Sequence, residues 1–351
     1  MLNCKETMKE LTERQNFILT LVIHDYTQNA QPIGSQYLVE RYNLDMSPAT
    51  VRNELSALDD AGYLNQPHTS AGRLPTDAGY RYFVGRLLND TELPQTTQRT
   101  ISHQFYQSRQ DMEQWMRLAA SVLAHQSNAA SVVTAPHTKT ARLKHLELIS
   151  TRGRQVLMVL VLIGGEINQQ VLTLAEPVTQ EQLSTSANRL NSICSGLDAA
   201  SIRKLAIQLG QLEEDILKLM LQELENSSHA LTGEIFMDGF SNVLAEPEFV
   251  NSEEARKSLR LLEERSKLEN LLNRTVLQSS IGGVQVLIGG EGKDEDLRQC
   301  SVVLARYGVP GLATGTLGVL GPTRMFYGKT ISTVRFMASL LSDLVSDSHV
   351  E

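Results

Sequence analysis

The chain has 351 residues, which is enough for two or three domains. Its hydrophobic fraction of 41% and charged fraction of 21% are those of an ordinary globular protein. No apolar run reaches the roughly 18 residues of a membrane span, and the N-terminal stretch lacks the apolar segment of a secretion signal. Three widely separated cysteines argue against structural zinc and a disulfide framework. We therefore expect a cytoplasmic protein that does not contact membranes.

The charge of the chain restricts how it could bind nucleic acid. The formal net charge is −8, and residues 1–93 hold 8 Lys+Arg against 12 Asp+Glu. Nucleic-acid binders usually carry a basic surface, so strong non-specific affinity for DNA is not expected. Specific binding would need a local basic face, for which the candidates are Arg52, Arg73, Arg81 and Arg86.

The first elements follow the order of a helix-turn-helix. Thr12 is a candidate N-cap for a first helix whose apolar stripe comprises Phe17, Ile18, Leu21 and Val22. Ser35 can cap a short helix over 36–42, and residues 43–46 form a tight turn into a third helix. Ser47 is a good N-cap for that helix, and Pro48 suits its first position. Helix, short helix, turn and helix is the helix-turn-helix order.

The third helix has one apolar and one polar face. Val51, Leu55 and Leu58 recur at helical spacing and predict the side that packs inward. The opposite side carries small or hydrogen-bonding residues, which suit entry into a major groove. They are Ala49, Arg52, Asn53 and Ser56, with Thr50 on the flank. A solvated surface face is the alternative explanation of the same pattern.

A hairpin follows this helix directly. Gly62 is expected to end the helix in the left-handed conformation, and residues 63–67 and 73–75 to form two short strands. The tip, 68–72, would be the wing of a winged helix. His68 is expected to contact DNA there and not to act in catalysis, and an ordinary surface histidine in a turn is the alternative. Thr76 can cap a further helix, after which residues 89–97 predict a domain boundary.

The rest of the chain mixes strands with helices. We expect a long helix over 98–128, then strands at 131–134, 143–149, 156–163 and 171–174. The run 156–163 has eight consecutive apolar residues and predicts a central strand buried on both faces.

Helices then interrupt the strands. They are predicted over 181–194, 199–224 and 252–272, before strands at 284–288, 301–307 and 315–320 and a last helix over 330–345. The second of these helices carries an apolar stripe in steps of three and four, which is typical of a helix–helix seam. The stripe could equally be the internal core of a helical hairpin.

Several patterns of enzymes are missing from the sequence. The glycine pairs at 164–165 and 289–290 continue neither as a phosphate loop nor as a dinucleotide fingerprint. The histidines show no zinc-ligand spacing. We therefore predict no catalytic residues, metal or cofactor, and no enzymatic activity.

Four blocks of the sequence resemble the heat-inducible transcription repressor family HrcA. They are SPATVRNEL (47–55), LNQPHTSAGRLPTDAGYRYFV (64–84), NVLAEPEF (242–249) and LGVLGPTRMFYG (317–328). Because the blocks run from the third predicted helix to the C-terminal part, the resemblance covers essentially the whole chain. The residues by themselves predict only a helix-entry turn for the stretch 321–324.

The resemblance implies an α+β protein with three parts. These are a winged helix-turn-helix DNA-binding domain over 1–90, a GAF-like α/β domain over 98–177 and 276–351, and a mostly helical dimerisation domain inserted at 178–275. It further implies a homodimer that binds an inverted-repeat operator on double-stranded DNA, represses chaperone operons, and is kept active by the chaperonin GroEL. A regulator that senses a small molecule through the GAF-like domain is the alternative.

The expected contacts follow from the motifs and the resemblance together. For dimerisation we expect Leu209, Ile216 and Leu219. The predicted DNA-contacting residues are Ser35, Ser47, Thr50, Arg52, Asn53, Ser56, His68, Thr69, Ser70, Arg73 and Arg81.

Overall fold

The computed structural model confirms the α+β class. It divides into two compact units, one made of residues 1–133, 236–305 and 317–337, the other of 134–235, 306–316 and 338–351. The structure describes residues 11–68, 71–87, 92–108, 111–137, 141–163, 167–174, 176–205, 209–229, 234–250, 264–276, 281–289, 297–310 and 312–348.

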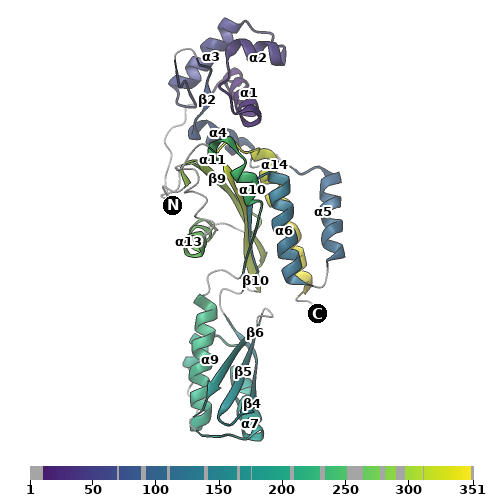
Figure 1. Ribbon diagram of the computed structural model, residues 1–351, viewed down its shortest axis with the longest axis vertical. Helices are drawn as coiled ribbons and strands as arrows, with labels where there is room; N and C mark the ends of the chain where they lie inside the picture. Colours follow the sequence, from purple (N-terminus) through teal and green to yellow (C-terminus); the bar gives the residue numbers. More distant parts are fainter. Residues whose placement is uncertain are drawn as a thin grey trace. The chain divides into compact units, whose positions relative to one another are not determined.

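The first unit begins with a small helical module, residues 11–87, which we call the N-terminal module. Its elements are α1 (Glu13–Asn29), α2 (Ser35–Tyr42), α3 (Pro48–Asp60), β1 (Leu64–Asn65), β2 (Leu74–Pro75) and α4 (Asp77–Leu87) (Figure 1). The predicted caps are confirmed for α1, where Thr12 accepts from the Gln15 amide, and for α3, where Ser47 accepts from Thr50. Gly62 has the expected positive φ of 81°. Two details were wrong, because Gly34 and not Ser35 is the N-cap of α2, and Phe17 is exposed at the edge of the α1 stripe.

A five-stranded sheet with the order β7-β3-β10-β9-β8 follows the N-terminal module. Its strands are β3 (Ala130–Thr134), β7 (Ile235–Asp238), β8 (Val284–Ile288), β9 (Cys300–Val309) and β10 (Ala313–Pro322). Four of these five were predicted. β10 pairs antiparallel with β3 from Leu317 opposite Val133, and β8 pairs antiparallel with β9.

Beyond the N-terminal module, six described helices belong wholly or partly to the first unit and lie before, between or after the strands of this sheet in the sequence. They are α5 (Gln95–Gln107), α6 (Met112–Ser127), α10 (Phe240–Leu244), α11 (Pro247–Val250), α13 (Arg265–Val276) and α14 (Tyr327–Ser348). The single helix predicted over 98–128 is wrong, since α5 ends at Gln107 and Asp111 caps α6 separately. The predicted start at residue 252 of the helix before β8 lies outside the described residues.

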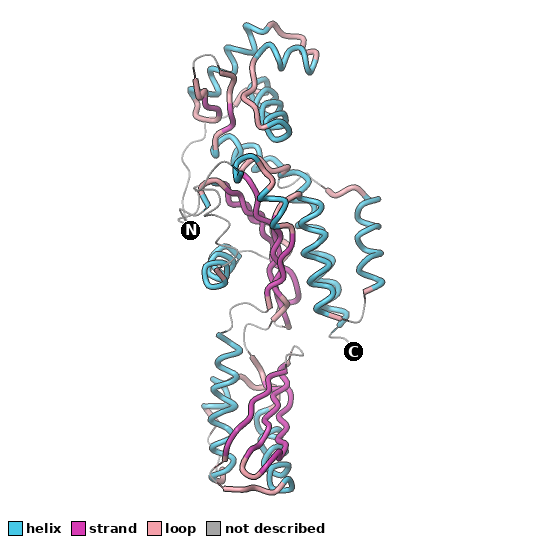
Figure 2. Tube along the Cα trace, in the orientation of Figure 1, coloured by secondary structure: helices cyan, strands magenta, loops and turns pink. Residues whose placement is uncertain are grey.

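The second unit contains a separate three-stranded antiparallel sheet with the order β4-β5-β6 (Figure 2). Its strands, β4 (Leu143–Arg152), β5 (Gln155–Leu162) and β6 (Ile167–Thr173), share one hydrophobic core with α7 (Gln180–Cys194), α8 (Ala199–Arg203) and α9 (Gln211–His229). The boundary predicted at 177/178 is therefore wrong, because it would cut this core between its sheet and its helices.

The burial of β5 also differs from the prediction. Val156, Met158, Leu160 and Leu162 are buried, whereas the residues between them are half-exposed. The strand is central, as predicted, but only one of its faces packs on helices. The other face of this sheet is open within the described part of the chain.

The predicted dimer stripe needs correction as well. Ile216 is 0% exposed and belongs to the core of its own unit, and Leu209 and Leu219 pack against that core. A residue that is fully buried within one subunit cannot form a contact between two. The alternative, an internal core, is therefore correct for Ile216.

Candidate nucleic-acid interface

Helix α3 is held by its apolar side and presents its polar side outward. Val51, Leu55 and Leu58 are buried, as the spacing predicted. The Ser47 hydroxyl accepts a hydrogen bond from the Thr50 amide at 3.1 Å and lies 2.9 Å from the Thr50 hydroxyl. The first turn of α3 is thus fixed before any ligand binds.

Arg52 and Asn53 are exposed side by side on the outer surface of α3. Neither side chain has a hydrogen-bond or ion-pair partner among the residues that the structure describes. Ser47 is exposed as well, whereas Thr50 and Ser56 are half-buried beside them and Ser35 is half-buried at the start of α2. The structure therefore brings the predicted α3 residues together on one face, with Ser35 on another element.

The hairpin after α3 is attached to the segment before α2. β1 and β2 pair with Leu64 opposite Pro75, and the backbones of Ile33 and Arg73 exchange hydrogen bonds of 3.0 and 2.8 Å. A Cβ on Gly72 would lie 2.4 Å from the Ile33 carbonyl carbon, so this close pairing requires glycine. His68 is exposed at the hairpin's tip. Thr69 and Ser70, also predicted to contact DNA, lie outside the described residues.

The expected role of Arg73 is not supported. Its guanidinium lies 3.0 Å from the Asp59 carboxylate, and its side chain is only 14% exposed. A cation paired with a carboxylate of its own module is poorly placed to neutralise a phosphate. Arg73 instead links the hairpin to the C-terminal turn of α3.

Arg81 is likewise turned away from the α3 surface. Its Nη2 donates to the carbonyl oxygen of Val286 on β8 at 2.8 Å. Burial lowers the pKa of the Arg81 guanidinium, and Tyr327 opposes that shift. The head group of Arg81 thus serves the packing of α4 on the sheet, which does not support the predicted DNA contact. The side chain of Arg86 lies outside the described residues.

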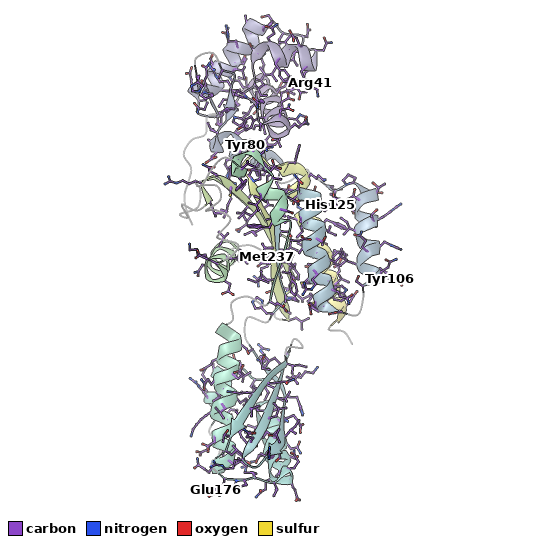
Figure 3. All side chains as sticks on the ribbon, in the orientation of Figure 1. Arg41, Tyr80, Tyr106, His125, Glu176 and Met237 are labelled. Carbon is purple, nitrogen blue, oxygen red and sulfur yellow. The ribbon has the colours of Figure 1, made fainter. Side chains whose placement is uncertain are left out.

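One exposed cation of the N-terminal module was missed. Arg41 is exposed in the last turn of α2, immediately before the turn into α3 (Figure 3). In a helix-turn-helix the helix before the recognition helix crosses the DNA backbone. A basic residue at the end of that helix, in an otherwise acidic module, was the signal that could have identified it.

The described residues hold neither a candidate metal site nor a candidate membrane-spanning helix. They contain no group of three or more His, Cys, Asp or Glu side chains that could hold a metal ion. Over the same ranges, no helix combines the length and the apolar character needed to cross a membrane.

A cavity of about 440 Å³ beside β3 and β7 bears on the ligand-sensing alternative. Two of its polar side chains bond to nearby backbone, since the Ser131 hydroxyl donates to the Ala120 carbonyl and the Asp238 carboxylate accepts from the Gly239 amide, and Ser241 is the third polar side chain in the lining. Ligand sites present convergent polar groups. This cavity therefore does not favour a small-molecule sensor.

Comparisons with known proteins show the family to which the chain belongs. A relative from Roseiflexus castenholzii, named heat-inducible transcription repressor HrcA, is 45% identical over 346 residues, covering 96% of this chain and 95% of the relative. A relative of the same name from Herpetosiphon aurantiacus is 43% identical over 349 residues, covering 97% of each chain. A solved structure described as a hypothetical protein at 2.2 Å resolution shares the fold, with a TM-score of 0.65 at 22% identity over 97% of this chain and 100% of that one.

These relatives define the class as heat-inducible transcription repressors of the stress response. A family profile described as the HrcA protein C terminal domain matches residues 113–331. The chain belongs to the HrcA family.

Proposed function

We propose that the chain is a sequence-specific DNA-binding repressor of chaperone operons whose N-terminal module is a winged helix-turn-helix. The observation that carries the proposal is the outer surface of α3, where Arg52 and Asn53 are exposed and unpaired among the described residues. An inward apolar stripe and a capped first turn hold this surface rigid. A rigid helix with free hydrogen-bonding groups on its outer side suits the major groove.

Within this proposal the two side chains read bases. Arginine matches the O6 and N7 atoms of guanine, and asparagine matches N6 and N7 of adenine, each with two hydrogen bonds. Ser47 and His68 are exposed at the edges of the same module and would contact phosphates or base edges. Arg41 at the end of α2 would contact the backbone.

Replacement of Asn53 tests the proposal. We expect Asn53→Ala to weaken operator binding by about 1–3 kcal/mol and to relax selectivity at a single base pair. Gln104→Ala is the matched control, because it also removes an exposed helical amide, but on α5. Gel shifts with operator and with random DNA give the comparison. Equal losses on both DNAs for Asn53→Ala would refute base reading.

We also propose that the chain is a homodimer that binds an inverted repeat. The open face of the β4-β5-β6 sheet supports a second copy as its partner. Ile149, Ile167 and Val171 are 42%, 57% and 60% exposed there. Ile149 and Val171 lie opposite Leu157 in one row across the sheet, so the apolar side chains are contiguous. Contiguous apolar surface of this kind marks interfaces.

A charge on this face tests the dimer. Val171→Glu should give monomers that fold normally, because its side chain is exposed in the subunit. Val171→Thr keeps the β-branched shape and should stay dimeric. Light scattering and gel shifts on the same samples measure both effects, and operator affinity should fall by about 10²–10⁴ in the monomer. A Val171→Glu variant that remains dimeric would contradict this interface.

The chaperonin GroEL remains the proposed partner that keeps the repressor active in the cytoplasm, on the strength of the family membership. A repressor of marginal stability loses active molecules on heating. Purified protein should lose operator binding on mild heating and recover it with chaperonin and ATP. Full binding after heating without chaperonin would argue against this dependence.

A further inference from the structure

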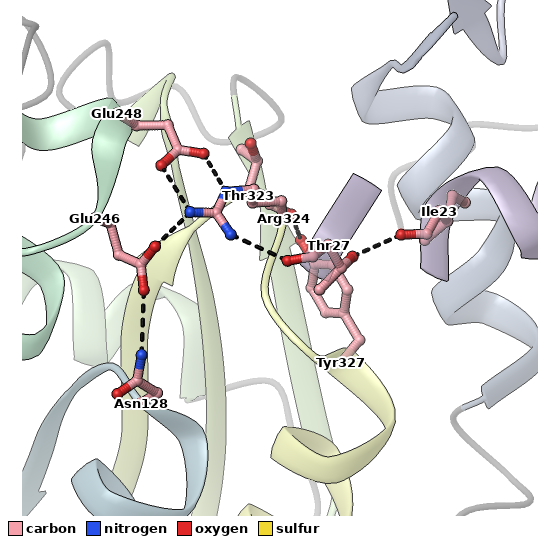
Figure 4. A network of polar contacts seen from close by, with 8 residues as sticks. All are labelled: Ile23, Thr27, Asn128, Glu246, Glu248, Thr323, Arg324 and Tyr327. Carbon is pink, nitrogen blue, oxygen red and sulfur yellow. Dashed lines mark hydrogen bonds and ion pairs between the residues drawn. The ribbon is translucent and has the colours of Figure 1, made fainter. Parts of the chain in front are cut away.

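A buried arginine joins the N-terminal module to the sheet region of the same unit. Arg324 follows β10 and is 9% exposed. Its guanidinium is hydrogen-bonded to the Glu248 carboxylate through Nε and Nη2, and to Glu246 through Nη2 (Figure 4). The Nη1 atom donates to the Thr27 carbonyl oxygen at 3.0 Å. Asn128 holds Glu246 from the end of α6 at 3.1 Å.

The hydrogen bond from Arg324 to Thr27 satisfies a carbonyl group at the C-terminal end of α1. Thr27 lies in the last turn of α1, where the final carbonyl groups have no partner within the helix and the helix dipole is negative. α1 has no basic residue of its own in that turn. Arg324, 297 positions along the chain, supplies the missing cation and donor. Burial opposes the charge of Arg324, but the Glu248 and Glu246 carboxylates outweigh it and raise its pKa.

The turn that carries Arg324 is itself rigid. Tyr327, three residues further on, donates to the Thr323 carbonyl at 2.7 Å, and its hydroxyl lies 2.7 Å from that of Ser301 on β9. The Tyr327 ring also packs against Tyr80 of α4, with centroids 5.7 Å apart. The N-terminal module thus meets one short turn through a charged contact at α1 and an aromatic contact at α4.

We propose that Arg324 is a positioning residue that fixes the orientation of the N-terminal module, and that this orientation sets the half-site spacing that a dimer can bind. The second part rests on the proposed DNA-binding function. The tilted Tyr80–Tyr327 pair and the hydrogen bond from Arg81 to Val286 hold α4, but neither contacts α1. The planar guanidinium, held by two carboxylates, is directional and aligns the axis of α1. Removing it leaves the module attached through α4, with the end of α1 no longer tied to the turn, so that the orientation of the module should vary more.

A distance measurement without DNA tests the first part. Spin labels are placed at Asn65→Cys in the hairpin and Ser121→Cys on α6, both exposed positions of the same unit, in a chain with Cys4→Ser. We expect one narrow distance distribution in the parent chain and a broad one in Arg324→Met. Arg324→Lys keeps the cation and should give an intermediate width. An unchanged distribution in Arg324→Met would overturn the proposal.

A second variant and a control distinguish a change in the orientation of the N-terminal module from a loss of folding. Glu248→Gln keeps the shape of the side chain but removes one charge, and should broaden the distribution even if Arg324→Met unfolds. Arg117→Met removes the ion pair with Glu113 on α6 and the contact of the guanidinium with the Phe236 ring on β7, neither of which involves the N-terminal module, and should leave the distribution narrow.

Operators with altered spacers test the second part. The parent should prefer the native spacing over one changed by half a helical turn by about 10²–10⁴, the usual range of avidity. We expect less than about tenfold preference in Arg324→Met, with single half-site affinity unchanged. A broadened distribution with an unaltered spacing preference would refute the link to spacing. If the parent binds no DNA, the proposed function fails, while the distance measurement still decides the role of Arg324.

Discussion

Salt dependence of operator binding can distinguish the arginines that face DNA from those that hold the protein together. Each phosphate that a protein cation neutralises releases counterions, so the slope of log affinity against log salt falls by about 0.9 per contact. Arg41 is exposed at the end of α2. Arg73 and Arg81 are committed to Asp59 and to Val286. We therefore expect only the first of the three to contribute to the slope.

The size of the effect follows from the proposed dimer. Arg41→Ala removes one contact from each subunit, so the slope should become shallower by about 1.8. When salt rises from 50 to 200 mM, the operator affinity of Arg41→Ala should therefore fall about 12-fold less than that of the parent chain. Arg73→Ala and Arg81→Ala should leave the slope unchanged, although both should lower the melting temperature. Since random DNA has the same backbone, Arg41→Ala should change its slope equally.

The assay is fluorescence anisotropy with labelled operator at several salt concentrations, on variants first checked for folding by circular dichroism. A slope that drops by nearly two for Arg73→Ala or Arg81→Ala, but not for Arg41→Ala, would refute the assignment. It would mean that the ion pair of Arg73 with Asp59, or the hydrogen bond of Arg81 to Val286, opens on binding and that the guanidinium faces the phosphates.

Three further outcomes follow from the packing. Ile216→Ala should destabilise the second unit by about 2–5 kcal/mol in denaturant unfolding, because the side chain is fully buried, whereas a dissociated but equally stable variant would contradict that placement. Gly79→Ala should cost about 1–3 kcal/mol, since its Cβ would lie 2.2 Å from the Tyr63 carbonyl oxygen, and wild-type stability would show that α4 can shift freely. Cys194 is buried, and burial raises the pKa of its thiol. We expect alkylation of Cys194 at pH 8 to be at least about 100-fold slower in the native than in the unfolded chain, which corresponds to a free energy of local opening of about 2.7 kcal/mol. Rapid native labelling, mapped by mass spectrometry, would refute that expectation.

The elements of the N-terminal module could be predicted because their determinants are local. A cap such as Ser47 depends on residues two or three positions away, and the stripe of Val51 and Leu55 on a period of 3.6. The positive φ of Gly62 follows from its place after a helix end. None of these inferences requires knowledge of the tertiary fold.

The roles of the arginines could not be predicted in the same way. Arg73, Arg81 and Arg324 find their partners 14, 205 and 297 positions away along the chain. A sequence shows that an arginine is present but not which carboxylate or carbonyl it will meet. For the same reason the stretch 321–324 predicted only a turn, whereas it places a cation at the end of α1.

The apolar run of β5 was misread for a different reason: burial in the proposed dimer would account for the apolar residues that the subunit itself leaves half-exposed. Eight consecutive apolar residues predicted two covered faces, and one subunit covers only one. In the proposed dimer, Ile149, Ile167 and Val171 of both copies would add six side chains at about 1.5–3 kcal/mol each if fully buried, a gross gain of roughly 9–18 kcal/mol. Their partial burial in the subunit lowers that figure, and association costs about 4–15 kcal/mol. The surplus is small, so a single glutamate at Val171 should suffice to separate the subunits.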